Sequence, residues 1–337
     1  MSPPPADAGD SLVVTGAAGF IGARLAVRLI VEGERVVAAD AKGHFSARPE
    51  IASLYRAAPP AEVVDREDLP AWLDARPPSA VAGVLHMGAC TDTTEFDEAY
   101  LERTNTAYTR RLWEWAAARE VPFLYASSAA VYGGGEKGYD DEEPPGGLAP
   151  LNPYGWSKHR FDVWALGEGG RRPPPRWSGF RFFNVYGFGE AHKGKMASVL
   201  HQAFRQIQEG GEVRLFRSHR EGIADGHQKR DFVFVDDVVD VLLHAWRVGV
   251  PSGIYNLGTG RARTFLDLAR ASFSALGREP KVAYIDTPPG IRERYQYFTQ
   301  AKMDKLRRAG YTSAFLSVEE GARRYWERLA GELVSPG

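Results

Sequence analysis

The feature that most constrains the fold is a glycine-rich turn near the N-terminus. Glycines at positions 16, 19 and 22 follow a short apolar segment, residues 11–15, and open an amphipathic stretch over residues 21–31. The first glycine permits a tight turn, the second lets the backbone approach a pyrophosphate, and the third permits close helix–sheet packing. The helix N-terminus adds oriented N–H donors. The predicted dinucleotide contacts here are Gly16, Gly19, Phe20, Ile21 and Gly22.

An acidic residue, Asp40, ends the next predicted strand, residues 35–40. It stands about 20 residues after the glycines, where a carboxylate can accept hydrogen bonds from the adenosine ribose. Glycine spacing alone is weak in a chain with 36 glycines, but strand, glycines, helix and acid together are strong. Unopposed, Asp40 favours NAD because it repels a 2′-phosphate. Lys42, and more weakly Arg48, could offset that repulsion and admit NADP, so the residues leave the choice open.

Strands and helices alternate over the first half of the chain. Residues 81–86, 123–128 and 178–183 read as buried strands, and residues 98–119 and 153–166 read as helices. This alternation predicts an α/β fold with a Rossmann-type doubly wound parallel sheet and helices on both faces. After Gly187 the alternation is less regular, which indicates a smaller C-terminal α/β substrate lobe.

The domain organisation follows from this shift. We expect a disordered tail over 1–10, a dinucleotide-binding domain over 11–187 with returns near 229–262, and a substrate-binding lobe over 188–228 and 263–332.

Composition excludes several classes of function. A net charge of −1 favours neither nucleic acid nor an anionic membrane as partner. Cys90 is the only cysteine, which excludes an internal disulfide, and the histidines show no metal-ligand spacing, so no metal is predicted. His86, at a strand end, is expected to be a satisfied core or cofactor-adjacent group rather than a metal ligand.

The N-terminal residues have no apolar signal segment, and no apolar run approaches the roughly 18 residues of a membrane helix. We expect a cytoplasmic enzyme.

Tyr154 and Lys158 are four residues apart, hence on one face of the predicted helix. A nearby ammonium stabilises phenolate, so the tyrosine can exchange a proton at neutral pH although its ordinary pKa is about 10. Ser128, at the C-terminal end of a predicted strand, can hydrogen-bond the same hydroxyl. The alternative is that this tyrosine and lysine are ordinary surface residues without a chemical role. The glycine turn in the same chain disfavours that alternative.

These residues, in this order, resemble the extended short-chain dehydrogenase/reductase family, whose members commonly transform nucleotide-linked sugars. The Asn105 region and residues 181–187, 230–237 and 255–260 extend the match to nearly the whole chain. The resemblance implies a homo-oligomer. It also implies further cofactor contacts at Met87, Gly88, Ala89, Cys90, Asn105, Tyr154, Lys158 and Val185.

A narrower resemblance joins residues 86–95, 189–198 and 294–301 to the ADP-glyceromanno-heptose 6-epimerases. That group inverts C6″ of the heptose through a transient ketone, in the synthesis of lipopolysaccharide core precursors. The resemblance implies Tyr154 and Lys193 as acid/base groups on opposite faces of the reacting carbon, with Ser128 in support and NADP as the usual cofactor. A lysine base needs a pKa lowered by burial or by neighbouring cations, and His192 and Lys195 are close in sequence.

Arg230 follows a polar loop and precedes a strand, and a diphosphate of the sugar nucleotide is a natural partner for its guanidinium. The sequence departs from the group's pattern at two places that bear on ADP recognition: Lys195 replaces a small polar residue, and the loop over 219–228 is longer than usual. The implied substrate contacts are Thr94, Asn184, Lys195, Gln202, Phe216, Arg230 and Tyr295.

Two alternatives remain open from the sequence. A 4-epimerase, dehydratase or reductase on the same scaffold is the first, although a dehydratase would want an acidic pair beside Ser128, where Ala129 and Ala130 stand. A non-catalytic dinucleotide sensor is the second, although a sensor has no need of Ser128, Tyr154 and Lys158.

Overall fold

The computed structural model describes residues 10–167, 172–292 and 295–334. Residues 1–9 of the predicted 1–10 tail, and Arg294 from the resembling segment near the C-terminus, lie outside these ranges. The chain divides into two compact units. The first unit comprises the residues up to Ser127, Asn152–Phe180 and Leu242–Ile254; the second comprises Ser128–Leu151, Arg181–Val241 and the residues from Tyr255 onward.

A seven-stranded sheet forms the core of the first unit, in the order β10-β6-β5-β4-β1-β2-β3. Strand β1 pairs in parallel with β2 and β4, as do β2 with β3 and β4 with β5. This confirms the predicted Rossmann-type sheet. The strands are β1 Ser11–Thr15, β2 Val36–Asp40, β3 Glu62–Asp65, β4 Val81–His86, β5 Phe123–Ser128, β6 Trp177–Phe182 and β10 Gly253–Leu257.

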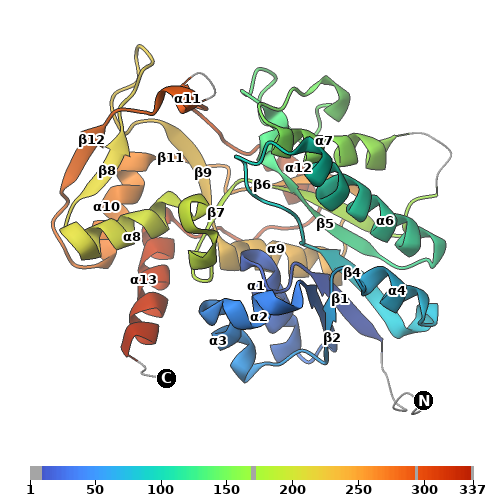
Figure 1. Cartoon of the computed structure of the whole chain (residues 1–337). Helices are drawn as coiled ribbons and strands as arrows, with labels where there is room; N and C mark the ends of the chain where they lie inside the picture. The colour runs from blue at the N-terminus through green and yellow to red at the C-terminus, as the bar shows by residue number, and fades with distance from the viewer. Residues whose placement is uncertain (1–9, 168–171, 293–294, 335–337) are drawn as a thin grey trace. The chain divides into compact units, whose positions relative to one another are not determined.

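Helices cover both faces of this sheet, as the buried strands of a parallel sheet require. On one face, Trp113 packs on Phe123 and Phe161 packs on Tyr125. On the other, a Cβ at Gly83 would lie 2.3 Å from the ring of Trp246, so only glycine fits there. Figure 1 shows α6 and α7 on one side of the strands and α1 and α9 on the other. The helices are α1 Phe20–Val31, α2 Lys42–Ala47, α3 Pro49–Ala57, α4 Leu69–Asp74, α5 Glu98–Leu101, α6 Tyr108–Ala118, α7 Pro153–Leu166 and α9 Val235–Arg247.

Aromatic rings fill the α6 side of the sheet. The Trp113 ring lies 4.9 Å from that of Trp177 and 5.7 Å from that of Phe161, both edge-on. Such pairs contribute about 0.5–1.5 kcal/mol each beyond the area they bury. The helical periodicity of residues 98–119 predicts one broad face with Tyr100, Leu101, Tyr108, Leu112 and Trp115. Leu101 and Leu112 are buried, the other three are half-buried, and the fully packed Trp113 is outside that predicted face.

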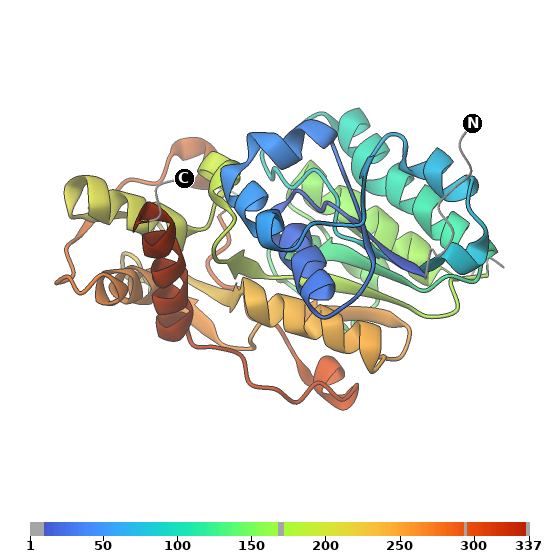
Figure 2. The same ribbon diagram turned by 90° about the horizontal axis from the view of Figure 1, so that it is seen from below.

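The second unit is also α/β. A three-stranded sheet has the order β11-β9-β7, and β8 pairs in parallel with β12. Helices α8 and α10 pack on the smaller sheet through Ile207, Phe273 and Leu215. Helix α13 lies beside α8 (Figure 2), where the Tyr325 hydroxyl is 2.7 Å from His201 Nδ1. The elements are β7 Asn184–Tyr186, β8 Val213–Phe216, β9 Lys229–Phe234, β11 Ala262–Thr264, β12 Val282–Ile285, α8 Val199–Gly210, α10 Phe265–Ala275, α11 Pro289–Arg292, α12 Asp304–Arg308 and α13 Val318–Val334.

Shorter helical turns complete the described chain: the 3₁₀ turns η1 Pro78–Ala80, η3 Ala129–Tyr132, η4 Pro145–Gly147 and η5 Ala191–Met196, and the π-helical turn η2 Glu102–Ala107. None of the helices in the described ranges is both long and apolar enough to cross a bilayer.

Candidate functional site

The glycine turn joins β1 to α1 with no room for side chains. Gly16 has φ +65°, and a Cβ there would lie 2.7 Å from the Gly88 nitrogen. A Cβ at Gly22 would lie 2.1 Å from the Gly16 carbonyl oxygen. Helix α1 begins at Phe20 with Gly19 as its N-cap, so no side chain covers the helix N-terminus. These contacts fit a pyrophosphate cradle, in which backbone N–H groups and the helix dipole hold the anion.

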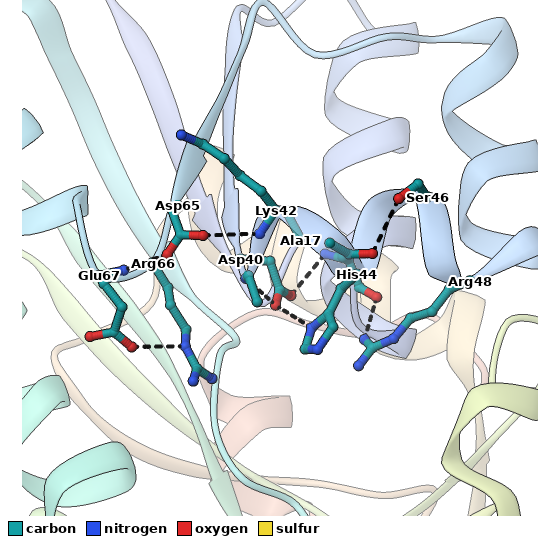
Figure 3. A network of polar contacts seen from close by, with 12 residues as sticks. Ala17, Asp40, Lys42, His44, Ser46, Arg48, Asp65, Arg66 and Glu67 are labelled. Carbon is teal, nitrogen blue, oxygen red and sulfur yellow. Dashed lines mark hydrogen bonds and ion pairs between the residues drawn. The ribbon is translucent and has the colours of Figure 1, made fainter.

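Asp40, at the end of β2, is buried and hydrogen-bonded by the protein itself (Figure 3). Its carboxylate accepts from Ala18 N at 3.0 Å and Ala41 N at 2.8 Å, and lies 2.9 Å from His44 Nδ1. These contacts fix the carboxylate against the glycine turn. His44, four residues along in α2, was not anticipated from the sequence.

The basic residues near Asp40 differ in placement (Figure 3). Arg48 is half-buried and donates from Nη1 to the Ala18 carbonyl at 2.6 Å, and burial lowers its pKa while Asp40 raises it. Lys42 is exposed; its backbone N–H bonds Asp65, and its ammonium lies 3.8 Å from the Asp68 carboxylate. Arg48 is therefore the cation fixed to the glycine turn, whereas Lys42 has an extended side chain at the surface.

His86 ends β4 as a buried neutral group. Its Nδ1 is 2.7 Å from Thr15 Oγ1 and its Nε2 is 2.8 Å from Thr109 Oγ1. Burial, assisted by the positive charge of Lys158, lowers the pKa of His86 to about 3. Both nitrogens are used within the protein, which confirms the prediction of a satisfied core histidine. Across the described ranges, no three His, Cys, Asp or Glu side chains gather as a metal site would require.

Asn105 fixes the segment that follows β4. Its Oδ1 accepts from Cys90 N at 2.8 Å, and its Nδ2 donates to the Cys90 carbonyl at 3.0 Å and to Ser157 Oγ at 3.0 Å. It lies in η2, where the predicted helix over 98–119 takes a π-helical turn, a feature often found at functional positions. The Cys90 thiol is half-buried, and burial raises its pKa. Met87, also in this segment, is buried, while Gly88 and Ala89 are half-buried.

Tyr154 and Lys158 share a buried face of α7, as their spacing predicts. The helix begins where Asn152 Oδ1 accepts from Gly155 N at 2.7 Å. Lys158 Nζ donates to the Ala126 carbonyl at 2.9 Å, and burial lowers its pKa to about 8 against the opposing charge of Asp162. A lysine with this pKa is mostly protonated at neutral pH and can lose its proton about one pH unit higher.

Ser128 ends β5 and begins the second unit. It is half-buried, and its Oγ accepts from Ala130 N at 3.1 Å, which caps the following turn. The participation of Ser128, Tyr154 and Lys158 in catalysis stays a prediction.

Lys193 lies in η5, within the second unit, and is half-buried. Burial lowers its pKa, and the charge of Glu190 opposes this. The cause of the lowered pKa is therefore burial rather than the cations considered from the sequence, His192 and Lys195, which are both exposed. Gln202 donates from Nε2 to the Gly194 carbonyl at 2.8 Å and so supports the same loop.

Arg230 is a buried cation between aromatic rings. Its guanidinium carbon lies 5.5 Å from the ring centroids of both Phe265 and Tyr295. Within the part of the chain that the structure describes it forms no ion pair, and burial lowers its pKa. A buried guanidinium without an acid suits an anionic ligand with planar oxygens, such as a phosphate.

The remaining predicted substrate contacts are more dispersed. Asn184 is exposed on β7, with Val185, a predicted cofactor contact, half-buried beside it; Phe216 ends β8 and is half-buried. Thr94, in the first unit, is exposed, and its Oγ1 donates to Asp92 at 2.6 Å. These residues are not joined to one another by hydrogen bonds in the described part of the chain, so their placement alone does not indicate a ligand-binding site.

Several structural partners of the site were missed from the sequence. Asp162 accepts from Tyr125 and Ser127 at 3.1 and 3.0 Å, and Glu190 ties the Lys193 loop. Helical spacing could have found Asp162, since it stands four residues after Lys158. No comparable local signal points to Glu190.

The glycine turn, the acid that ends β2 and the seven-stranded sheet define a Rossmann-type fold, and Tyr154 and Lys158 lie buried on one helix of the same unit. The model of the NAD dependent epimerase/dehydratase family matches residues 12–258. Two curated relatives, from Fusobacterium nucleatum and Nitratidesulfovibrio vulgaris, are named ADP-L-glycero-D-manno-heptose-6-epimerase; each is 42% identical and aligns with 93% of this chain and 96% of its own. The crystal structure of the Helicobacter pylori protein of that name superposes with TM-score 0.78 at 27% identity, covering 97% of this chain and 98% of its own.

The chain belongs to the NAD dependent epimerase/dehydratase family, and the predicted resemblance is confirmed. Its fold and family support a nicotinamide cofactor.

Proposed function

We propose that this chain is an isomerase that interconverts ADP-D-glycero- and ADP-L-glycero-D-manno-heptose at C6″ through a transient ketone. The reaction would serve lipopolysaccharide core precursor synthesis in the cytoplasm. One observation carries the proposal: a buried Tyr154–Lys158 pair, with Lys158 near pKa 8, occurs in a chain that matches relatives named for this reaction over more than nine tenths of its length.

Two proton-transfer groups suit an inversion, because the reacting hydroxyl lies on different sides of the carbon before and after. We assign Tyr154 and Lys193 to these opposite faces. Lys158 stabilises the Tyr154 phenolate electrostatically, and Ser128 hydrogen-bonds the reacting oxygen. The burial that lowers the pKa of Lys193 favours its neutral amine, the form that accepts a proton.

The residues that would hold the cofactor are the glycines of the turn, Asp40 and the segment that Asn105 fixes. A nicotinamide held there would supply reversible hydride transfer. We propose NADP as the bound form, with Lys42 and Arg48 as partners of the 2′-phosphate. The contacts of Asp40 with Ala18 N, Ala41 N and His44 support this, because they disperse the charge that would repel a phosphate.

Denaturing the purified protein and identifying the released nucleotide tests the cofactor assignment. We expect NADP, and recovery of NAD alone would contradict it. In the emptied protein, Lys42→Ala should weaken NADP binding up to about tenfold, a loss of about 1.4 kcal/mol, and leave NAD binding unchanged. Lys281→Ala, at another exposed ion-paired lysine, is the matched control.

We propose that the dinucleotide-binding domain spans 11–187 with 229–262, and that 188–228 and 263–332 bind the sugar nucleotide. Arg230 would bind the diphosphate, which is supported by its burial between two aromatic rings and by the lack of an ion pair to it among the described residues. Thr94, Asn184, Lys195, Gln202, Phe216 and Tyr295 are the other proposed substrate contacts.

We also propose a homo-oligomer. Trp156, Val163 and Leu166 are exposed on α7, and apolar side chains gathered on one helix favour association. Light scattering on the purified protein tests this, and a monomer at micromolar concentration would refute it.

The decisive experiment for the reaction is to incubate the protein with each ADP-heptose epimer and follow C6″ by NMR. Formation of the same equilibrium mixture from both epimers is the expected result. A 4-epimerase or dehydratase would leave C6″ unchanged and act on a hexose nucleotide instead. The neutral Ala129 and Ala130 beside Ser128 favour epimerisation over dehydration.

A further inference from the structure

Glu190 is an acidic side chain with no solvent exposure, and it lies three residues before Lys193. A buried carboxylate is costly unless hydrogen bonds compensate it. Glu190 Oε1 accepts from Gly187 N at 3.1 Å and from Ser198 Oγ at 2.7 Å, and Oε2 accepts from Ser198 N at 2.6 Å. Three donors from two residues, the backbone N–H groups of Gly187 and Ser198 and the Ser198 hydroxyl, therefore converge on one carboxylate.

These bonds close the segment that carries Lys193. Gly187 precedes the segment 188–197 and Ser198 follows it, so the Glu190 carboxylate is hydrogen-bonded to both ends of the segment. In the middle, Lys193 N donates to the Glu190 carbonyl at 2.9 Å. Ser198 also caps α8 by accepting from His201 N at 3.2 Å, which anchors the segment to a regular helix. The backbone on either side of Lys193 is thus fixed by Glu190 and by α8.

Charge couples the same two side chains. Burial lowers the pKa of Lys193, and the negative charge of Glu190 partly offsets this by raising it. Burial raises the pKa of Glu190, and the hydrogen bonds from Ser198 and the positive charge of Lys193 partly offset this by lowering it. Glu190 can therefore affect both where the amine lies and how readily it holds a proton.

We propose that Glu190 is a positioning residue for Lys193: its carboxylate holds the 188–197 segment in the shape that presents the amine, and its charge sets the amine's proton affinity. This inference rests on the proposed acid/base role of Lys193. It assigns Glu190 no contact with substrate or cofactor.

The test is Glu190→Gln, which keeps the side-chain size and removes the charge. We expect kcat for C6″ epimerisation to fall about 10²-fold, the scale of a small misplacement of a reacting group. KM and cofactor content should stay within a few-fold of wild type. The limb of the pH–rate profile that belongs to Lys193 should move to lower pH, because loss of a negative charge favours the neutral amine.

Ser198→Ala is the control for a merely structural role. It removes one hydrogen bond to Glu190 and the cap of α8, which costs about 1 kcal/mol of stability, but it leaves the charge in place. Its pH limb should not move. Unchanged kcat in Glu190→Gln, or reduced kcat with an unmoved limb, would overturn the inference.

A direct titration separates this inference from the proposed function. Reductive ¹³C-methylation and NMR follow the Lys193 amine, assigned by its loss in Lys193→Arg, without turnover. The other titratable or charged side chains of the segment and of α8 are His192, Lys195, His201, Arg205 and Glu209; these, and Tyr325 of α13 beside His201, stay in both proteins. A lower Lys193 midpoint in Glu190→Gln supports the inference even if C6″ inversion is not found, and an equal midpoint contradicts it.

Discussion

The two units hold their polar groups in different ways. In the first unit, Asp40, His86 and Tyr154 stand at strand ends or on a helix, so the sheet and α7 fix their backbones. In the second unit, Lys193 and the 259–260 turn lie in short irregular segments. The carboxylate of Glu190 holds the Lys193 segment and that of Asp231 holds the 259–260 turn, whereas Asp40, His86 and Tyr154 themselves lie on or at the ends of regular elements.

Asp231 shows the second arrangement most fully. It has no solvent exposure, and its carboxylate accepts from Thr259 N at 2.7 Å, Thr259 Oγ1 at 2.7 Å, Gly260 N at 2.9 Å and Ala301 N at 3.0 Å. One side chain of β9 thus joins two distant segments. The comparison teaches that irregular segments gain a fixed shape when a buried acid collects their N–H groups, as Glu190 does around Lys193.

The comparison predicts that a proton-transfer group on a helix can be removed without loosening the fold. Tyr154→Phe should lower epimerase turnover by about 10²–10⁴-fold, the usual range for a lost general acid or base. Cofactor content and the free energy of unfolding should stay close to wild type, because Lys158 and Asn152 still fix α7. Turnover within a few-fold of wild type would end the assignment of Tyr154.

In the second unit, removal of a collecting carboxylate should act on stability. Asp231→Ala leaves the N–H groups of Thr259, Gly260 and Ala301 buried without their acceptor, at a cost on the order of 3 kcal/mol of unfolding free energy. Urea denaturation measures it. Asp286→Ala, at an exposed acid 3.7 Å from Arg217, should be nearly neutral. Equal unfolding free energies of the two variants would contradict the claim that a buried carboxylate holds the irregular segments of the second unit.

A smaller effect on stability should come from His86, which is buried in the first unit as a neutral imidazole. Its pKa is about 3 when folded, against an ordinary 6.5. As pH falls below 6.5, the unfolded chain binds a proton that the folded chain does not. The stabilisation is therefore present above pH 6.5 and is lost by about 1.4 kcal/mol per pH unit down toward pH 3.

His86→Asn should flatten that part of the stability curve, measured by urea unfolding between pH 6 and 4.5. His219→Gln, at an exposed histidine in the second unit, should leave the slope unchanged. An unaltered slope in His86→Asn would show that burial of the imidazole does not govern the acid limb.

The sequence predicted what depends on local pattern. The strands on either side of the glycine turn follow from short apolar runs, and the common face of Tyr154 and Lys158 follows from their spacing in one helix. The same kind of spacing predicted the buried position of Leu112 but not that of Trp113. Strand β3 was missed, since Glu62–Asp65 is short and partly polar.

The carboxylate ties were also missed, because their partners are remote in sequence. Asp231 reaches Thr259 and Ala301, 28 and 70 residues away. His86 could be predicted as satisfied, but its partners Thr15 and Thr109 could not be named, since they meet only when β1, β4 and α6 assemble. Such contacts depend on tertiary register, which no local periodicity encodes.

The central claim is that Lys193 is the second proton-transfer group, and Lys193→Met tests it most directly. Turnover and substrate affinity should be measured in both directions of C6″ epimerisation, with Lys281→Met as the control at an exposed lysine of the same unit. We predict that turnover falls about 10²–10⁴-fold with little change in affinity, because transition-state proton transfer is lost. Weakened affinity with unchanged turnover would make Lys193 a substrate anchor and contradict the claim.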